Sequence, residues 1–505
     1  MYTMKKNKIV VVFSSHLGKA ENDKFIWHIK KTIGKIEHEV ICYENYNQYS
    51  LTEVYNKALN KYKENNTIIL FVHPDIIIKT RDWGKLLLNK FNNNHYDILG
   101  VAGSTYIPDN GIWWSDRNKM HGIVEHTDGS STWISEYSSE KKGHITETVS
   151  IDGLFMAVNP NTIIHQFDED FLGFHFYDLS FCIPNYLDGC NIGVTTDLRI
   201  LHKSVGMTNE QWEFNRNKFI DKYYMDLPVS ILPIFNDFNL MLENNPKVTV
   251  IIPTKNNFKY ISNNIQSWKN VVKYSNYEII MADTGSDESV IEQYNSFLCS
   301  RIKLIKYDYY NFAKINNDVV KNHVSEDTEL ILFCNDDVTL LNDALSRCVE
   351  IYNEHKNKIG TIGIRLHYGD SSIQHCGISI RRNKTNNLIL SHIDLRKTIN
   401  YCTTVKNTLG NTAAFLLINK NLFIETGYFN ENYIECLEDV ELNLECLLRD
   451  RINITVCDAV AYHYESVSRN KDNEKNRKFQ IDYTNNLLPY YLLNINKLKS
   501  HIHEE

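Results

Sequence analysis

Two adjacent carboxylates, Asp336 and Asp337, directly follow a run of apolar residues that ends at Cys334. An acidic pair at the end of a buried strand is costly unless water solvates it or a cation neutralises it. Hard divalent cations take oxygen ligands and commonly bridge protein carboxylates to phosphates. The pair therefore indicates a cation and phosphate site, although a solvated acidic turn is the better explanation of such a pair in isolation.

A second acidic cluster, Glu438 and Asp439, opens a segment with helical spacing. A carboxylate in this position can act as a general base that removes the proton from an attacking hydroxyl. The simpler interpretation is an acidic first helical turn whose charge complements the helix dipole. The residues alone leave both interpretations open.

A histidine, His463, ends a β-like run that begins at residue 452. A lone histidine is usually structural, but this one has a counterpart, His202, after an apolar run in the first half of the chain. Imidazole can ligate a metal or contact a diphosphate. Both histidines are therefore candidate ligands.

The elements that position these groups alternate between strands and helices. In the second half we expect strands at residues 248–254, 277–283 and 329–334 and helices at residues 259–273 and 312–323. This alternation predicts a parallel α/β sheet, in which ligands bind outside the carboxyl ends of the strands. Thr254, Asp283 and the Asp336–Asp337 pair are then expected to converge.

The first half follows the same plan, with expected strands at residues 8–14, 39–44 and 67–73 and an expected helix at residues 51–62. Asp75 and Asp178 are 103 residues apart, and Asp337 and Asp439 are 102 residues apart. His202 follows Asp178 by 24 residues, as His463 follows Asp439. Ser14 and Glu44 are 30 residues apart, and Thr254 and Asp283 are 29 residues apart. Agreement at three separations predicts a tandem duplication.

Composition narrows the class of protein. The 505 residues allow two to four domains, and a net charge of −8 argues against nucleic-acid binding through a basic surface. The sequence has no apolar run of 18 residues, so we predict no membrane span, and the basic start lacks a signal-peptide core. Eleven cysteines without a C-x-x-C motif indicate reduced thiols, and we expect a cytoplasmic protein.

An ordered set of motifs across residues 247–469 resembles the family 2 glycosyltransferases with a GT-A fold. The motifs are I-I-P-T-K-N from residue 251, A-D-T-G-S-D from 282, F-A-K-I-N-N from 312, N-D-D from 335, I-Q-H-C-G from 373, G-Y-F-N-E from 427, E-D from 438 and H-x5-R from 463 to 469. The I-Q-H-C-G stretch is similar to one in bacterial surface-polysaccharide members. The order of the set, rather than any single motif, carries the resemblance.

The resemblance implies a role for each matching residue of the second unit. These roles are donor binding for Thr254, Asp283 and Asn316, binding of Mn²⁺ or Mg²⁺ for Asp336, Asp337 and His463, and catalysis for Asp439 as the base with support from Glu438. The first acid of the family's D-x-D-type metal motif is Asn335 here.

The first unit resembles a more divergent branch of the same superfamily, with V-H-P-D at residues 72–75 and Y-D at residues 177–178. The implied roles are catalysis for Asp178, cation binding for Asp75 and His202, and substrate binding for Ser14, Glu44, Trp113 and Trp114. The tryptophan pair would form a sugar-stacking surface, although aromatic pairs more often serve packing. The divergence leaves open whether this unit is active or degenerate.

We therefore expect an α/β chain of two tandem GT-A domains, which are Rossmann-like nucleotide-diphospho-sugar transferase folds, and a C-terminal helix. The expected bounds are 1–240 for the divergent domain, 247–475 for the family 2 domain and 476–505 for the helical tail. The expected enzyme is a hexosyltransferase-type glycosyltransferase that moves a sugar from a nucleotide-sugar donor to a glycan or glycoprotein hydroxyl. Transfer is expected to be inverting and metal-assisted, and two sites make a bifunctional enzyme conceivable.

The alternative is one catalytic domain beside a non-catalytic domain that binds glycan or acts as a scaffold, and a polymerase that adds alternating sugars is a further alternative. A nucleotidyltransferase would carry a Gly-rich basic loop after the first strand, which is absent after Thr254. A glycoside hydrolase would need two carboxylates flanking the bond. The sequence names neither donor nor acceptor, and it leaves peripheral membrane contact and the oligomeric state open.

Overall fold

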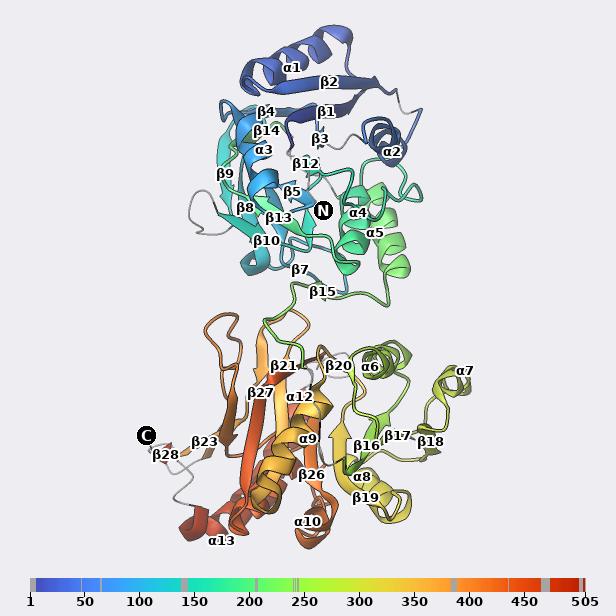
Figure 1. The fold of residues 1–505 in the computed structure, drawn as a ribbon, viewed down its shortest axis with the longest axis vertical. Helices are drawn as coiled ribbons and strands as arrows, with labels where there is room; N and C mark the ends of the chain where they lie inside the picture. The colour runs from blue at the N-terminus through green and yellow to red at the C-terminus, as the bar shows by residue number, and fades with distance from the viewer. Residues whose placement is uncertain are drawn as a thin grey trace. The chain divides into compact units, whose positions relative to one another are not determined.

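A computed structural model shows how the chain folds (Figure 1). The structure describes residues 6–46, 48–63, 66–137, 144–204, 208–238, 240, 242, 245–382, 388–434, 436–464, 473–498 and 503–504. The chain divides into two compact units, Met1–Ile231 and Leu232–Glu505. The finer domain bounds expected from the sequence stay a prediction.

The first unit is built on a seven-stranded sheet with the order β10-β13-β5-β12-β3-β1-β2. Its strands are β1 (Lys8–Ser15), β2 (Glu37–Glu44), β3 (Thr67–Val72), β5 (Ile98–Gly100), β10 (Ile145–Glu147), β12 (Phe155–Val158) and β13 (Ile192–Thr195). A second sheet has the order β11-β6-β8-β14-β4, with β9 beside β8. Its strands are β4 (Ile76–Ile78), β6 (Ala102–Ser104), β8 (Met120–Thr127), β9 (Thr132–Glu136), β11 (Ser150–Ile151) and β14 (Ile200–His202). Two further strands, β7 (Tyr106–Ile107) and β15 (Val229–Ser230), form a separate two-stranded sheet.

Burial on both faces of the sheet explains why residues 9–13 of β1 are all apolar. Ile9, Val11 and Phe13 pack in one core, and Val10 and Val12 pack in another, because successive strand residues point to opposite faces of a sheet. The first core includes residues of α1 (Lys19–Thr32), α3 (Trp83–Asn93) and α5 (Glu210–Lys222), and the second includes residues of α2 (Leu51–Lys61) and α4 (Tyr177–Leu187).

The second unit contains a ten-stranded sheet whose main path is β18-β17-β16-β19-β26-β21-β27-β20. These strands are β16 (Lys247–Thr254), β17 (Tyr277–Asp283), β18 (Ile302–Lys306), β19 (Thr328–Cys334), β20 (Val338–Leu340), β21 (Ile359–His367), β26 (Phe415–Asn419) and β27 (Ile452–His463). The remaining two, β22 (Ile373–His375) and β25 (Val405–Thr408), pair with β21 and β27, and β23 (Ile378–Arg382), β24 (Leu388–His392) and β28 (His503–Glu504) form a small sheet.

Helices cover both faces of this sheet too (Figure 1). One core includes residues of α6 (Phe258–Val271), α7 (Glu288–Tyr294) and α9 (Ala344–His355). The other includes residues of α8 (Phe312–Asn322), α10 (Lys420–Glu425) and α11 (Glu438–Leu448). The expected helix at the C-terminal end is observed as α12 (Asn473–Asp482), a π-helical turn (Tyr483–Leu487) and α13 (Leu488–Leu498), and Leu487, Tyr491 and Leu498 pack in a core with residues of α11.

The expectation of a purely parallel sheet is wrong in both units. The strands β12 and β26 run antiparallel to β3 and β19, respectively, and β10 with β13 and β20 with β27 are further antiparallel pairs. No strand is predicted between residues 338 and 451, and the position of β26 between β19 and β21 was therefore not expected. The α/β class and the tandem GT-A-like arrangement are confirmed.

The two units repeat the same main-chain contacts at their strand ends. The amides of His73 and Asn335 donate to the carbonyls of Leu154 and Ala414, and the amides of Lys203 and Tyr464 donate to the carbonyls of Asp75 and Asp337. The register likewise pairs Ile76 with His202 and Val338 with His463. These pairs confirm the tandem duplication. Across the described residues, the structure contains no helix that is both long and apolar enough to cross a bilayer.

Candidate active sites

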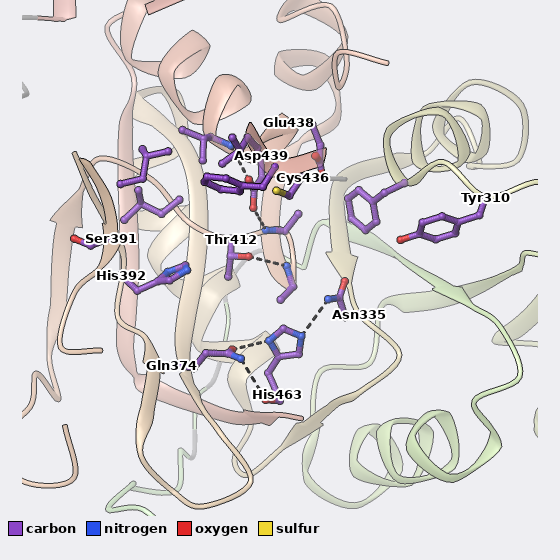
Figure 2. A pocket seen from close by; sticks show the side chains of 18 residues that line it. Tyr310, Asn335, Gln374, Ser391, His392, Thr412, Cys436, Glu438, Asp439 and His463 are labelled. Carbon is purple, nitrogen blue, oxygen red and sulfur yellow. Dashed lines mark hydrogen bonds between the residues drawn. The ribbon is translucent and has the colours of Figure 1, made fainter. Parts of the chain in front are cut away.

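In the second unit, the imidazole of His463 lies between the side chains of Asn335 and Gln374 (Figure 2), and it also contacts the predicted cation ligand Asp337. Its Nε2 lies 3.2 Å from Oδ1 of Asp337 and 3.1 Å from Nδ2 of Asn335. The side chains are adjacent because β27 ends at His463, whose antiparallel partner, Val338, directly follows Asp337. His463 and Asp337 are only 7% and 8% exposed. Two predicted cation ligands, Asp337 and His463, thus lie in contact at a position that is almost fully buried.

Gln374 in β22 decides which nitrogen of His463 carries the lone pair (Figure 2). Its Oε1, which can only accept, lies 2.6 Å from Nδ1 of His463, so Nδ1 carries the proton. In the neutral imidazole, Nε2 then has a lone pair, which accepts from Asn335 and lies beside the Asp337 carboxylate. A lone pair and a carboxylate in contact suit a shared cation. Gln374 belongs to the I-Q-H-C-G motif, but no feature of the sequence predicts its contact with His463.

A cavity of about 340 Å³ lies beside this cluster (Figure 2). Asn335, Gln374 and His463 line one part of it, and Glu438 and Asp439 line another. Apolar side chains from three further elements complete the wall: Ile378 of β23, Leu390 of β24 and Phe479 of α12. The cavity wall therefore includes both the predicted base, Asp439, and one of the predicted cation ligands, His463.

Asp439 is held by backbone amides at the start of α11. Its Oδ2 accepts from the amide of Ala413 at 2.9 Å and its Oδ1 from the amide of Val440 at 2.8 Å. Burial raises the pKa of Asp439 above its usual value, against the opposing effect of these amides. A carboxylate whose pKa rises towards neutrality is a stronger proton acceptor, which suits a general base.

The predicted donor-binding residues lie at the ends of β16 and β17, where Thr254 and Asp283 face each other in register. The hydroxyl of Thr254 donates to Oδ2 of Asp336 at 2.8 Å. Burial, followed by the charge of Asp337, raises the pKa of Asp336 to about 7. Oδ1 of Asp283 is buried and has no hydrogen-bond partner among the described residues. Such an orphaned acceptor at a strand end suits an N–H or O–H group of a ligand.

Asn316 does not join this group. It lies within α8, and its Nδ2 donates to the carbonyl of Phe312 one turn earlier in the same helix. The neighbouring Asn317 instead donates to the carbonyl of Phe429 and to Oε1 of Glu431. Arg469, the last residue of the quoted motifs, lies outside the described residues.

The first unit has an equivalent cluster, in which a histidine replaces the asparagine. Nε2 of His202 lies 3.5 Å from Oδ2 of Asp75. His73, Asp75 and His202 present potential ligand atoms that all lie within 4.8 Å of one another. Asp75 and His202 are predicted cation ligands, whereas His73 is not, although His73 stands two residues before Asp75 as Asn335 stands before Asp337.

Asp178 repeats the arrangement of Asp439 at the start of α4. Its Oδ2 accepts from the amide of Gly153 at 3.1 Å and its Oδ1 from the amide of Leu179 at 2.9 Å. Burial and then the charge of Asp152 raise the pKa of Asp178 to about 7. The first unit therefore keeps a carboxylate suited to accept a proton near neutral pH.

The register places Ser15, rather than Ser14, opposite Glu44. The amide of Asn45 donates to the carbonyl of Ser15, as the amide of Thr284 donates to the carbonyl of Thr254. Ser15 is therefore the structural equivalent of Thr254. The hydroxyl of Ser14 accepts from Nδ2 of Asn45 at 3.2 Å, so Ser14 remains at the same strand end.

The tryptophan pair divides between core and surface. Trp113 is only 6% exposed and packs in the core of the first unit, whereas Trp114 is 41% exposed. The ring centroid of Trp114 lies 5.6 Å from that of Trp113 and 5.8 Å from that of Trp212. Of the two, only Trp114 presents a large ring area for stacking on a sugar.

Comparison with known proteins agrees with this geometry. Residues 20–223 match a family model described as "Glycosyltransferase like family", and residues 249–423 match "Glycosyl transferase family 2". The chain is 28% identical over 275 residues to the uncharacterized protein y4gI of Sinorhizobium fredii (strain NBRC 101917 / NGR234), a match that covers 51% of this chain and 29% of that protein. It is 22% identical over 247 residues to the O-antigen biosynthesis protein RfbC of Myxococcus xanthus, with 47% and 19% covered. The matches thus span less than a third of either relative.

Two solved structures show a weaker likeness. GalNAc-T7 with UDP, GalNAc and Mn²⁺ has a TM-score of 0.42 at 11% identity, covering 56% of this chain and 59% of that chain. S. aureus TarS 1-349 has a TM-score of 0.31 at 19% identity, covering 46% and 69%. The two family models together establish the class: the chain carries two glycosyltransferase domains in tandem, of which the second matches glycosyl transferase family 2.

Proposed function

We propose that both units are active, and that each transfers a sugar from a nucleotide-sugar donor to a hydroxyl of a glycan or a protein-linked glycan. The observation that carries this proposal is the duplicated carboxylate at a helix start. Asp178 and Asp439 each accept from two backbone amides, and burial raises the pKa of each. A domain kept only as a scaffold has no need for this arrangement.

In the second unit, Asp439 accepts the proton of the acceptor hydroxyl while the hydroxyl oxygen attacks the anomeric carbon of the donor. The bond from that carbon to the diphosphate oxygen breaks, and the nucleoside diphosphate leaves with the electron pair. One base and a single displacement give inversion at the anomeric carbon. Thr254 and Asp283 bind the nucleotide at the strand ends, and Glu438 lies beside the base on the cavity wall.

Asp337 and His463 fit a divalent cation such as Mn²⁺ or Mg²⁺, because Gln374 leaves the lone pair of His463 on Nε2 beside the carboxylate. Asp336 lies next to them but is engaged by Thr254. When bound, the cation would supply positive charge that stabilises the leaving diphosphate.

The similarity of about half of the chain to an O-antigen biosynthesis protein supports a bacterial surface glycan as the acceptor. Because nucleotide-sugar donors are made in the cytoplasm, we propose that the protein acts there.

Nucleoside diphosphate release from a panel of UDP-, GDP- and dTDP-sugars, with and without Mn²⁺, tests the proposal. We expect at least one donor to be consumed by the wild-type chain and no donor to be consumed by the Asp178→Asn/Asp439→Asn double variant. Asp337→Ala should remove the EDTA-sensitive part of the second-unit activity. Full turnover by the double variant would refute the assignment of both bases.

A further inference from the structure

The paired strands β23 and β24 contribute one face to the cavity that Asp439 lines. Leu390 and His392 are two residues apart in β24, and Ile378 of β23 lies opposite His392 in the register. Because side chains alternate between the two faces of a strand, these three share one face. All three line the cavity together with Phe479 of α12, so an imidazole stands there beside an apolar wall (Figure 2).

A buried histidine behind this face holds the ring of His392. Nδ1 of His392 lies 2.7 Å from Nδ1 of His375, and the two rings meet at 74° with their centroids 4.9 Å apart. His375 ends β22, belongs to the I-Q-H-C-G motif and is only 1% exposed. Since His375 is not among the described residues that line the cavity, the Nδ1 edge of His392 is directed into the protein and the edge with Nε2 is left for the cavity.

The contact between the two imidazoles also decides which nitrogen of His392 carries a proton. Of two nitrogens in hydrogen-bond contact, one donates and the other accepts. Burial holds the pKa of His375 well below its ordinary value, so this ring is neutral, and its Nε2 has no hydrogen-bond partner among the described residues. Buried N–H groups without an acceptor are rare, so the proton of His375 belongs on Nδ1, from which it is donated to His392. Nε2 of neutral His392 then carries a proton and can donate to a ligand.

A hydrogen-bond donor beside an apolar wall is complementary to a small group that combines a carbonyl with a methyl. The N-acetyl group of an amino sugar has this composition: its carbonyl oxygen would accept from Nε2 of His392, and its methyl would pack on Leu390 and Phe479. A plain hydroxyl would leave the apolar wall in contact with water. The methyl of a deoxy sugar would cover the wall but would leave the donor without a partner.

The position of this wall indicates the acceptor rather than the donor. Asp439, the proposed base, lines the cavity, whereas Thr254 and Asp283 are not among the described residues that line it. Burial is the main effect on the pKa of Asp439, and the charge of His392 acts against it, so the imidazole is within electrostatic reach of the base. A sugar held by His392 is therefore close to the group that would take the proton of its hydroxyl.

We propose that His392, which His375 positions, forms with Leu390 and Phe479 an acceptor subsite for an N-acetylated amino sugar. The acceptor of the second unit is then a glycan that ends in such a sugar. This inference deepens the proposed function and rests on it for one point, namely that the bound sugar is the acceptor. Binding of the acetamido group follows from the cavity alone.

Sugar binding to the full chain tests the subsite without any transfer. The probes are methyl glycosides of glucose, galactose and mannose, each matched with its 2-acetamido-2-deoxy counterpart, and saturation-transfer NMR measures their dissociation constants. At least one acetamido glycoside should bind at least ~4-fold tighter than its hydroxyl counterpart, because its methyl group leaves water. The protons of that methyl should receive the strongest saturation.

Variants of the wall locate this binding. His392→Ala should weaken binding of the acetamido glycoside ~5-fold through the loss of one hydrogen bond, whereas His392→Gln, which keeps a side-chain N–H donor, should retain the preference. Leu390→Asn should reduce the preference without weakening the hydroxyl counterpart, and it provides a second test if His392→Ala does not fold. Ser379→Ala is the matched control and should change neither constant, because Ser379 bonds to Ser391 within the same strand pair and is not among the described residues that line the cavity.

Equal binding within every matched pair, no binding of any acetamido glycoside, or an unchanged preference in a folded His392→Ala variant would overturn the proposal. Nucleoside diphosphate release with the same glycosides as acceptors separates the subsite from the proposed function. Acetamido-selective binding that depends on His392, without transfer to any glycoside, would contradict the proposed function and leave a sugar-binding subsite standing. Transfer that does not distinguish the matched pairs would do the opposite.

Discussion

At the scale of single residues, the two helix-start aspartates share a backbone setting but differ in one neighbour. Asp152 directly precedes Gly153, which donates to Asp178, whereas Thr412 precedes Ala413, which donates to Asp439. The first unit thus places an acid where the second places a hydroxyl. The two bases should therefore titrate differently.

The Asp439→Asn substitution should lower kcat of the second-unit transfer and leave donor affinity nearly unchanged. The amide keeps one oxygen acceptor for the backbone but cannot take a proton, and loss of general-base help typically costs ~10²–10⁴ in rate. Steady-state kinetics combined with donor titration by calorimetry measures both quantities. A variant that loses donor binding while it still turns over bound donor would show that Asp439 is structural.

The first-unit transfer should increase as the pH rises through about 7. The pKa of Asp178 is raised to about 7, and only the deprotonated carboxylate accepts a proton, so the active form is lost below that pH. The charge of Asp152 contributes to this shift, and Asp152→Asn should therefore move the rising limb of the kcat profile to lower pH. A profile that does not respond to Asp152→Asn would contradict this assignment.

Residues whose position depends on register could not be found from the sequence. The predicted residue, Ser14, is one position away from Ser15, which faces Glu44. The separation of 30 residues in the first unit against 29 in the second does not show which serine is the equivalent of Thr254. Gln374 contacts His463 because the chain turns after β21 and β22 pairs antiparallel with it. The residues around position 374 do not show this turn. Asp337, Asp439 and His463, by contrast, were predictable because each stands at the edge of a long apolar or helical segment.

At the scale of elements, a buried asparagine in each unit connects one helix to the loop before the helix that carries the proposed base, α4 or α11. Nδ2 of Asn56 in α2 donates to the carbonyl of Phe167 at 2.8 Å, and Nδ2 of Asn317 in α8 donates to the carbonyl of Phe429 at 2.8 Å. Each asparagine also accepts from the amide of that same phenylalanine. The sequence reasoning highlighted the adjacent Asn316 instead.

Asn317→Ala should lower the free energy of unfolding by ~1–3 kcal/mol, because it leaves buried backbone groups without partners. It should also lower kcat more than donor affinity, since the loop leads into α11. Asn322→Ala is the control, because its amide bonds only to Asp318 at the exposed surface of the same helix. Chemical denaturation and kinetics of both variants make the comparison, and equal effects would contradict a positioning role for Asn317.

The ends of a strand could be predicted where an acidic residue directly follows an apolar run. An example is β17, which spans the predicted residues 277–283. The order and direction of the strands in the sheet could not be predicted in this way. Whether β26 lies parallel or antiparallel depends on the long excursion through β21 to β25 rather than on its own five residues. Local patterns therefore predicted the elements but not every neighbour.

At the scale of the whole molecule, the proposal of two active sites with different acids at their strand ends predicts two different products. Asp178→Asn should remove one transfer and leave the other at its normal rate, and Asp439→Asn should do the reverse. Mass and linkage analysis of the products formed from a defined acceptor distinguishes the two transfers. If Asp178→Asn leaves every product at its normal rate, the first unit is a binding or scaffolding domain.

The residues just before α4 and α11, Phe176 and Leu437, adopt left-handed backbone conformations with φ of 64° and 82°. Such a conformation costs a residue other than glycine ~1–3 kcal/mol, and it persists only while surrounding structure holds it. Both side chains are buried in hydrophobic cores, so the packing of those cores sustains the strained turn that aims each base. On heating, this turn should relax before the fold melts, and each transfer should lose half of its kcat at a temperature below the unfolding midpoint.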